Sequence, residues 1–403
     1  MIKTRITPTP QFILTLEKEQ EKSVLILTIE AGRATPYYYK ADGIREAYVR
    51  IGNESIVAPD YILNELILKG KNQSFDALPS DVKKEDYSFT LLEATYYERT
   101  LLKMEPKDYF SFCLADKKGY LTNAGRLFAD QYIVYNSRVF CTRWNGLEKG
   151  SVFDDALDDK EFEGNLIYLL RSASDFVKNN SKVRFYKDVE YRVDKPDYAE
   201  RAVTEALVNA LIHRDYIVSG SEVHIDMYDD RLEISSPGGM FDGKAVQEHV
   251  ITDIGSMRRN PVIADLFHRM KFMERRGSGL KKIISETEKL PGYNESLKPI
   301  FYSDGSSFRV ILKNVNYGTT KVSDKVSDKL NEKEKCFFNV LMTLAKEHDF
   351  VTTKIVAEAA GMPEATTRRY LAKFSKMDII VSDGKNRSKK YYLKHTFTTE
   401  ANH

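Results

Sequence analysis

The spacing of hydrophobic and polar positions predicts strands at the start of the chain and helices after them. Short stretches within residues 1–85 alternate or run apolar between turns, which is typical of strands, and 62–70 predict a short amphipathic helix. Helical periodicity dominates from 86 to 200. The clearest stretches there are helices over 109–131 and 160–179, with a strand over 137–146 between them.

The middle of the chain combines a buried helix with a hairpin. Residues 201–216 are nearly all helix formers with apolar side chains around most of the helix, so the pattern predicts burial on most sides. Residues 222–239 predict a strand, an Asp-Asp turn and a second strand that stops at Pro237-Gly238-Gly239. Another strand is predicted over 307–313. Strands and helices therefore mix within one domain.

Four polar residues run through the helix predicted at 201–216. Arg201, Glu205, Asn209 and His213 are spaced four apart, which places them as one stripe on a single face. A carboxylate can orient or deprotonate a water, and an amide oxygen one turn further on can hold Mg²⁺. The alternative is a satisfied buried network, in which Glu205 pairs with Arg201 and the other two side chains bond to loop backbone.

Two glycine-rich stretches follow the polar stripe, one at the end of the hairpin and one at the start of a later helix. Their candidate nucleotide-binding residues are Ser236, Gly238, Gly239, Gly277, Ser278 and Gly279. Backbone N–H groups at a helix start can bind phosphates. The stripe and the two stretches resemble the N box and glycine boxes of the GHKL ATPase fold of histidine kinases and DNA gyrase. The resemblance implies ATP and Mg²⁺ as ligands, Glu205 as catalytic residue and Asn209 as metal ligand.

The order of four motifs narrows this resemblance. EALVNALIHRDY, RLEISSPGGM, RRNPVIADLF and ERRGSGL are similar to the GHKL-like domain of bacterial transcriptional regulators that carries the label of an ATP-dependent DNA helicase C-terminus. Ser236 stands where the ordinary glycine box has an Asp that accepts from the adenine amino group, and Met240 replaces its final Gly. This departure argues against an ATPase, whereas Glu205 and Asn209 argue for one, so a weak ATPase activity is left open.

The N-terminal part carries a second resemblance. Residues 34–59 resemble the C-terminal half of a Schlafen AlbA-like domain, whose small sheet presents a turn with Arg50, Gly52 and Ser55. The upstream acidic segment of that domain is not found in the sequence, so we expect a partial module over 1–85. The partial module weakens the case for a nuclease or an independent nucleic-acid-binding function. Packing and oligomerisation are the alternative role.

The C-terminal part has the pattern of a winged helix-turn-helix. Helical patterns over 331–350, 352–361 and 363–379 precede a strand, a basic loop and a returning strand. The residues expected to contact double-stranded DNA lie on the third helix and the wing, and they are Thr366, Thr367, Arg368, Lys373, Lys385, Arg387, Lys389 and Lys390. The alternative is a winged helix that contacts proteins, with its charges merely solvated.

Charge and cysteine content limit the class of protein. The net charge is +2, yet residues 351–394 hold ten Lys or Arg against four acids, which indicates a polyanion partner for that end. No apolar run approaches the roughly 18 residues of a membrane span, and the N-terminus has no signal-peptide core, so we expect a cytoplasmic protein without membrane contact. Cys113, Cys141 and Cys336 lack metal-ligand spacing, which argues against a zinc site or a disulfide framework.

These patterns predict a multidomain α+β protein. Its parts are a module over 1–85, a GHKL-like α/β sandwich with a helical lead-in over 86–313, a linker over 314–331 and a winged helix-turn-helix over 332–396. The predicted function is a DNA-binding transcriptional regulator that senses a nucleotide, and we expect a homodimer because such modules usually bind paired half-sites. The alternatives are a nucleotide-dependent ATPase acting on nucleic acid, in defence or DNA processing, and a pseudo-ATPase scaffold.

Overall fold

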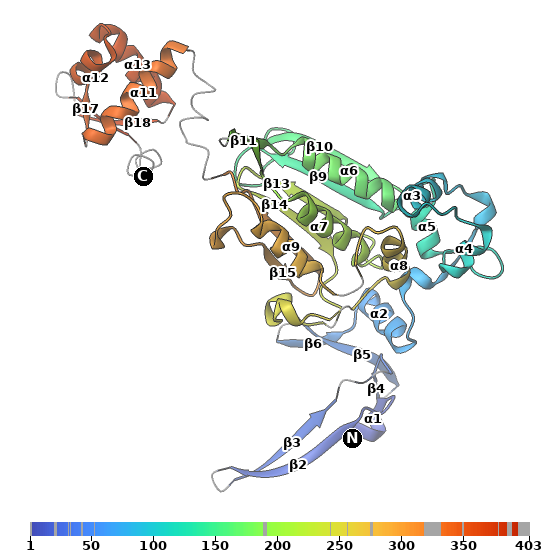
Figure 1. The fold of residues 1–403 in the computed structure, drawn as a ribbon. Coiled ribbons are helices and arrows are strands. Elements are labelled where there is room, and N and C mark those ends of the chain that lie inside the picture. Colours follow the sequence, from blue (N-terminus) through green and yellow to red (C-terminus); the bar gives the residue numbers. More distant parts are fainter. Residues whose placement is uncertain are drawn as a thin grey trace. The chain divides into compact units, whose positions relative to one another are not determined.

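The chain forms two compact units in the computed structural model, residues 1–315 and residues 316–403. Both contain helices and strands, which confirms the predicted multidomain α+β class (Figure 1). No helix among the described residues is long and apolar enough to cross a membrane. The structure describes residues 2–19, 22–30, 32, 34–41, 43–51, 53–187, 192–241, 243–255, 257–274, 277–317, 332–348, 350–377, 379–384 and 389–393.

A six-stranded sheet forms the centre of the first unit, in the order β10-β9-β13-β14-β16-β15. In that order its strands are β10 (Ala156–Glu163), β9 (Arg138–Trp144), β13 (Val223–Met227), β14 (Arg231–Pro237), β16 (Ser307–Lys313) and β15 (Ile300–Ser303). Strands β9 and β13 run parallel, and the other neighbouring pairs are antiparallel. The strand predictions for 222–239 and 307–313 are confirmed by β13, β14 and β16.

Three helices cover one face of this sheet, namely α6 (Leu166–Asn179), α7 (Glu200–Ile212) and α9 (Gly279–Glu288) (Figure 1). Leu232 and Ile234 of β14 are buried, because alternate side chains of a strand point to the same face. Helix α7 is buried along most of its length, as its nearly continuous apolar sequence predicts. It contacts both β14 and α9, so its polar positions meet those two elements.

Shorter elements complete the first unit. They are η1 (Phe75–Ala77), β7 (Pro79–Lys83), η2 (Lys84–Asp86), α3 (Thr90–Thr100), α4 (Pro106–Ser111), β8 (Tyr120–Thr122), α5 (Asn123–Phe128), β11 (Val183–Lys187), β12 (Arg192–Pro196), η3 (Val246–Glu248), η4 (Ile251–Asp253), α8 (Pro261–Arg269) and η5 (Glu295–Leu297). Asp76 joins two of them, because its carboxylate accepts hydrogen bonds from the backbone N–H groups of Val262 and Ile263 at 2.7 and 3.0 Å. The bonds satisfy free donors in the first turn of α8.

Two helix predictions are wrong in their extent. Residues 160–163 belong to β10, and α6 begins only after Gly164, which has φ 118°, and after the N-cap residue Asn165. The helix predicted over 109–131 is broken into α4 and α5. Thr122 sets the second start, because its hydroxyl accepts a hydrogen bond from the backbone N–H of Gly125 at 3.1 Å.

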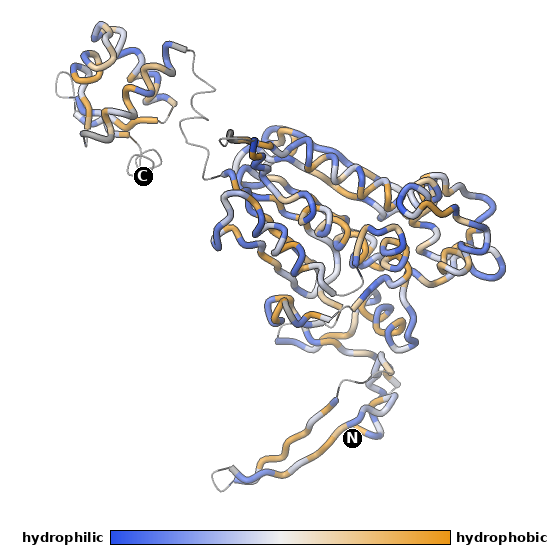
Figure 2. Tube along the Cα trace, in the orientation of Figure 1, coloured by the Kyte–Doolittle hydropathy of each residue, from blue (hydrophilic) through white to orange (hydrophobic). Residues whose placement is uncertain are grey.

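The N-terminal residues form a small sheet and a separate hairpin. The elements are α1 (Ile2–Arg5), β1 (Ile6–Thr7), the β2–β3 hairpin (Phe12–Glu19 and Lys22–Ile29), β4 (Tyr38–Ala41), β5 (Ile44–Ile51), β6 (Glu54–Val57) and α2 (Asp60–Gly70). The hairpin carries hydrophobic residues along both strands, and many are exposed (Figure 2). In the turn predicted after β5, Arg50 donates to Ser55 at 3.3 Å, and Gly52 lies outside the described residues.

The second unit contains three helices and a three-stranded sheet within its described residues. They are α11 (Glu332–Glu347), β17 (Val351–Thr352), α12 (Thr353–Ala360), α13 (Glu364–Lys376), β18 (Ile380–Asp383) and β19 (Lys390–Leu393), and the sheet order is β17-β19-β18. Its core is a cluster that includes Phe337, Leu371 and Phe374. The linker prediction for 314–331 falls mainly on residues outside the described ranges.

Candidate functional site

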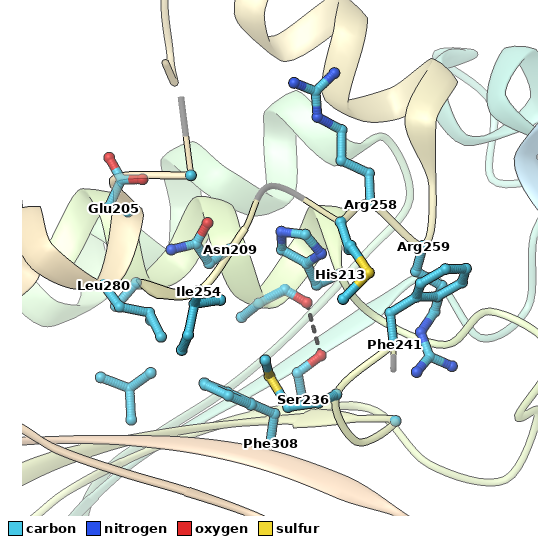
Figure 3. A pocket seen from close by; sticks show the side chains of 18 of the residues that line it. Glu205, Asn209, His213, Ser236, Phe241, Ile254, Arg258, Arg259, Leu280 and Phe308 are labelled. Carbon is cyan, nitrogen blue, oxygen red and sulfur yellow. Dashed lines mark hydrogen bonds between the residues drawn. The ribbon is translucent and has the colours of Figure 1, made fainter. Parts of the chain in front are cut away.

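A cavity of about 320 Å³ lies beside α7, β14 and α9 in the first unit (Figure 3). Its walls include an apolar group formed by Ile234, Met240, Ile254, Leu280, Phe308 and Val310. A polar group consists of Glu205, Asn209, His213, Ser236, Arg258 and Arg259, among others. A volume in the range of small-molecule sites, with mostly apolar walls and a few polar groups, is typical of a ligand pocket.

Most residues predicted for a nucleotide site meet at this cavity. The predicted catalytic residue Glu205 lines it, as do Asn209, Ser236, Gly238, Gly239, Gly277 and Gly279. Ser278 is the N-cap residue of α9 and is not part of the lining. Arg201, the first residue of the stripe, is exposed and away from the cavity. A spacing of four drifts around a helix with 3.6 residues per turn, so the ends of the stripe face different surroundings.

The start of α9 closely approaches two polar side chains of α7. A Cβ atom added at Gly279 would lie 2.9 Å from Oε1 of Glu205 and 3.0 Å from Nδ2 of Asn209. Glu205 also forms an ion pair with Lys282, whose Nζ lies 3.2 Å from Oε2. Burial raises the pKa of the Glu205 carboxyl group, and the Lys282 ammonium acts in the opposite direction. The structure thus pairs Glu205 with Lys282 of α9 and not with Arg201.

The next two residues of the stripe differ in their environments. No hydrogen bond joins the Asn209 side chain to another residue in the described part of the chain, although it faces the cavity (Figure 3). Burial lowers the pKa of His213 to about 4, and the positive charges of Arg259 and Arg258 lower it further. His213 is therefore a neutral imidazole at neutral pH, and Asn209 has an amide that can bind a ligand.

The end of β14 and the glycine turn after it line the cavity. The Ser236 hydroxyl donates a hydrogen bond to the carbonyl oxygen of Ala210 at 2.7 Å (Figure 3). Because this bond uses the hydroxyl proton, the Ser236 oxygen can only accept from a ligand in the cavity. Gly238 has φ 96°, and a Cβ at Gly239 would lie 2.1 Å from the carbonyl oxygen of Asp304. Both positions therefore require glycine.

Sequence reasoning missed Arg259, which lines the cavity, and Lys282, which does not line it but pairs with Glu205. Arg259 donates to Asp215 at 2.7 Å, to Glu65 at 3.2 Å and to the carbonyl oxygen of Gly239 at 2.9 Å. It therefore joins α2, the segment that follows α7 and the glycine turn. Arg259 stands within the RRNPVIADLF motif, but its partners are far away in the chain, so no local pattern predicts them.

The basic residues predicted to bind DNA have different surroundings in the second unit. Arg368 is exposed and pairs with Glu364 at 2.7 Å, whereas Lys373 pairs with the buried Glu334 at 2.7 Å. Lys389 and Lys390 are half-buried, with their ammonium groups over the rings of Tyr391 and Phe350 at 5.4 and 4.0 Å. Lys385 and Arg387 lie outside the described residues.

The surface role predicted for Thr367 does not fit the structure. Thr367 is fully buried, and its hydroxyl donates to the carbonyl oxygen of Pro363 at 3.2 Å. Thr366, one residue earlier, is half-buried. The exposed face of α13 instead includes Arg369 and Lys376, which the sequence pattern did not single out although both are basic and at helical spacing from Lys373.

Comparisons with known proteins support part of this picture. Residues 220–312 match the family described as "Putative ATP-dependent DNA helicase recG C-terminal", and this segment spans β13 to β16 with both glycine turns but begins after α7. A crystal structure of the DIP2311 protein from Corynebacterium diphtheriae has a similar fold, with a TM-score of 0.51 and 17% identity over 99% of this chain and 78% of that chain. A search of curated proteins finds no match. The first unit therefore carries a segment similar to an ATPase-like domain.

Proposed function

We propose that the protein is a DNA-binding regulator whose first unit senses an adenine nucleotide with Mg²⁺. The observation that carries the proposal is the cavity where Glu205 and Asn209 of α7 meet the glycine turn of β14 and the start of α9. The match of 220–312 to an ATPase-like family supports the same ligand class. The apolar side chains of the cavity suit a base, and its polar side chains suit phosphates and a metal ion.

The residues present fit the metal and the phosphates. The Asn209 amide has no hydrogen-bond partner among the described residues, so its oxygen can serve as the protein ligand to Mg²⁺, which typically takes few protein ligands together with substrate phosphates. The first backbone N–H groups of α9 have no partner within the helix, so they can bind phosphates beside Glu205 and Asn209. When bound, Mg²⁺ would neutralise phosphate charge, and the Ser236 oxygen would accept a hydrogen bond from the base.

The ion pair of Glu205 with Lys282 favours nucleotide sensing over rapid hydrolysis. In an ATPase of this type the carboxylate would orient or deprotonate a water, yet here it is paired with Lys282 at 3.2 Å. Ser236 is also a neutral acceptor where the family resemblance implies an Asp. A nucleotide-dependent ATPase acting on nucleic acid is the second candidate, because Glu205 still faces the cavity.

The second unit is proposed to be a winged helix-turn-helix that binds double-stranded DNA. Its element order of helix, strand, two helices and two strands supports this assignment, as does the basic exposed face of α13 with Arg368 and Arg369. Binding of paired half-sites by a homodimer is part of the same proposal. The 1–85 module is proposed to be a Schlafen AlbA-like module with a packing or oligomerisation role.

A thermal-shift screen of the full chain tests nucleotide sensing. ATP with Mg²⁺ at about 100 times Kd should stabilise the folded protein by about 2.7 kcal/mol, which corresponds to a rise in Tm of roughly 5 °C. The matched arms are ATP without Mg²⁺, Mg²⁺ alone and GTP with Mg²⁺, and each should give a smaller shift. Absence of any shift with ATP and Mg²⁺ at millimolar concentration would refute the nucleotide proposal and favour a scaffold.

A further inference from the structure

Lys282 is the cation that contacts the predicted catalytic carboxylate. It stands one turn after Gly279 in α9, and its Nζ lies 3.2 Å from Oε2 of Glu205 and 3.9 Å from Oε1 of Glu274. The Glu205 side chain is 6% exposed and that of Lys282 is 29% exposed. Lys282 itself is not a lining residue, but Glu205 and Glu274 both line the cavity, so the ammonium lies beside it with one buried anionic partner.

Both members of this ion pair are in costly positions. A positive charge near the start of a helix is unfavourable, because the helix dipole makes that end positive. A buried carboxylate is also unfavourable, and burial raises the pKa of Glu205 while Lys282 opposes that shift. Each charge thus compensates the other, and a stronger anion near the start of α9 would compete with Glu205 for the ammonium.

We infer that Lys282 binds the phosphate part of the cavity's ligand and that it leaves Glu205 when it does so. This inference rests on the proposed nucleotide site and adds to it the residue that reads the phosphates. A phosphate chain carries more charge than one carboxylate, and the backbone N–H groups at the start of α9 attract anions to the same place. Glu205 is therefore held in the unliganded protein and released in the liganded one.

The exchange predicts opposite effects from the two partners of the ion pair. Lys282→Met removes the cation, so affinity for ligands with phosphates should fall about 10- to 100-fold, the range for removal of a charge-assisted hydrogen bond. Glu205→Gln removes the competing anion, so the same affinity should rise several-fold. In the double variant the rise should vanish, because no ammonium is left to be released. If the ion pair is purely structural, the two single variants should either change the affinity in the same direction or leave the affinity unchanged.

The experiment is calorimetric titration of the full chain with three probes: ATP, adenosine and inorganic tripolyphosphate, each with Mg²⁺. Lys281→Met is the matched control, because Lys281 is the exposed neighbour on α9 and has no ion-pair partner among the described residues. It removes the same charge without touching Glu205. The double variant also guards against misfolding, since it leaves no unpaired buried carboxylate if Lys282→Met alone fails to fold.

The outcomes separate this inference from the proposed function. Loss of ATP and tripolyphosphate affinity in Lys282→Met, with unchanged adenosine affinity and no effect in Lys281→Met, supports the exchange. Equal effects of the two lysine variants, or a fall in affinity with Glu205→Gln, overturn it. A third outcome is that tripolyphosphate binds through Lys282, ATP binds no more tightly than tripolyphosphate, and adenosine does not bind. In that case the nucleotide proposal fails, while Lys282 remains an anion site. If none of the three probes binds the wild type, both proposals fail.

Discussion

Helices α7 and α13 have the same length, 13 residues, but opposite relations to their polar side chains. In α7 nearly every residue from Ala202 to Ile212 is buried, and Glu205 and Asn209 face a cavity. In α13 the apolar positions Tyr370, Leu371 and Phe374 face the core, and the basic residues lie on the exposed side.

The two helices differ in the desolvation free energy that their polar residues cost. A carboxylate or amide inside a buried helix gives up its hydration, so its presence at helical spacing indicates a partner, a cavity or a ligand. An exposed Arg or Lys gives up little, and Arg368 already pairs with Glu364 of its own helix. The polar stripe of α7 therefore predicts a site more strongly than the charge of α13 does.

The sharpest test of this contrast is Asn209→Ala. Binding of Mg-nucleotide should fall at least about 100-fold, since removal of a metal ligand costs more than the 10- to 100-fold typical of an outer partner. The Tm of the unliganded protein should change by less than about 2 °C, because the Asn209 side chain has no hydrogen bond among the described residues. Titration and thermal melting give the two numbers. A large fall in Tm would show that Asn209 is structural.

On α13 the corresponding change is Arg368→Ala. Affinity for the preferred DNA site should fall by about 1 to 3 kcal/mol, with a much smaller loss on random duplex, if this residue reads base edges. Fluorescence anisotropy with both duplexes measures the difference. Glu364→Gln is the matched control, because it breaks the same ion pair while keeping the cation, and it should leave affinity equal or higher. Equal losses on the two duplexes would contradict base reading.

The proposed wing should behave differently from the helix. Replacing Lys389 and Lys390 with Ala should weaken binding to every duplex and reduce the slope of log K against log salt by roughly one unit for each phosphate that is no longer neutralised. Lys390 lies over Phe350 at 4.0 Å, so melting of each variant is needed to separate weaker packing from weaker binding. An unchanged salt slope in folded variants would remove these lysines from the DNA surface.

His213 gives the cavity a predicted response to pH. Burial lowers its pKa from 6.5 to about 4, so between these values the unfolded chain binds a proton that the folded chain does not. The His213 contribution to stability is therefore present above about pH 6.5 and is lost as the pH falls towards 4. Urea unfolding at a series of pH values should show this loss, and His213→Gln should reduce the slope in that window. An unchanged slope would place the pH response on other groups.

Local patterns predicted the elements better than the contacts between them. The strand over 307–313 has the bounds of β16, because its alternation is local. The amphipathic pattern of 160–179 predicts a helix from residue 160, whereas pairing with β9 makes residues 160–163 a strand. At the cavity, Glu205 and Asn209 follow from spacing within one helix. Lys282 could not be predicted, because its partner lies in another helix and only packing joins them.

The smallest expected effect belongs to Thr367, which was predicted to contact DNA and is fully buried. Thr367→Val keeps the shape of the side chain and removes the hydroxyl that donates to the carbonyl oxygen of Pro363 at 3.2 Å. The loss of one such hydrogen bond should lower the free energy of unfolding of the second unit by about 1 kcal/mol. DNA affinity should stay unchanged at every salt concentration, since the side chain has no exposed surface. A selective loss of DNA affinity without loss of stability would show that Thr367 lies on the DNA-facing side of α13 and not in the core.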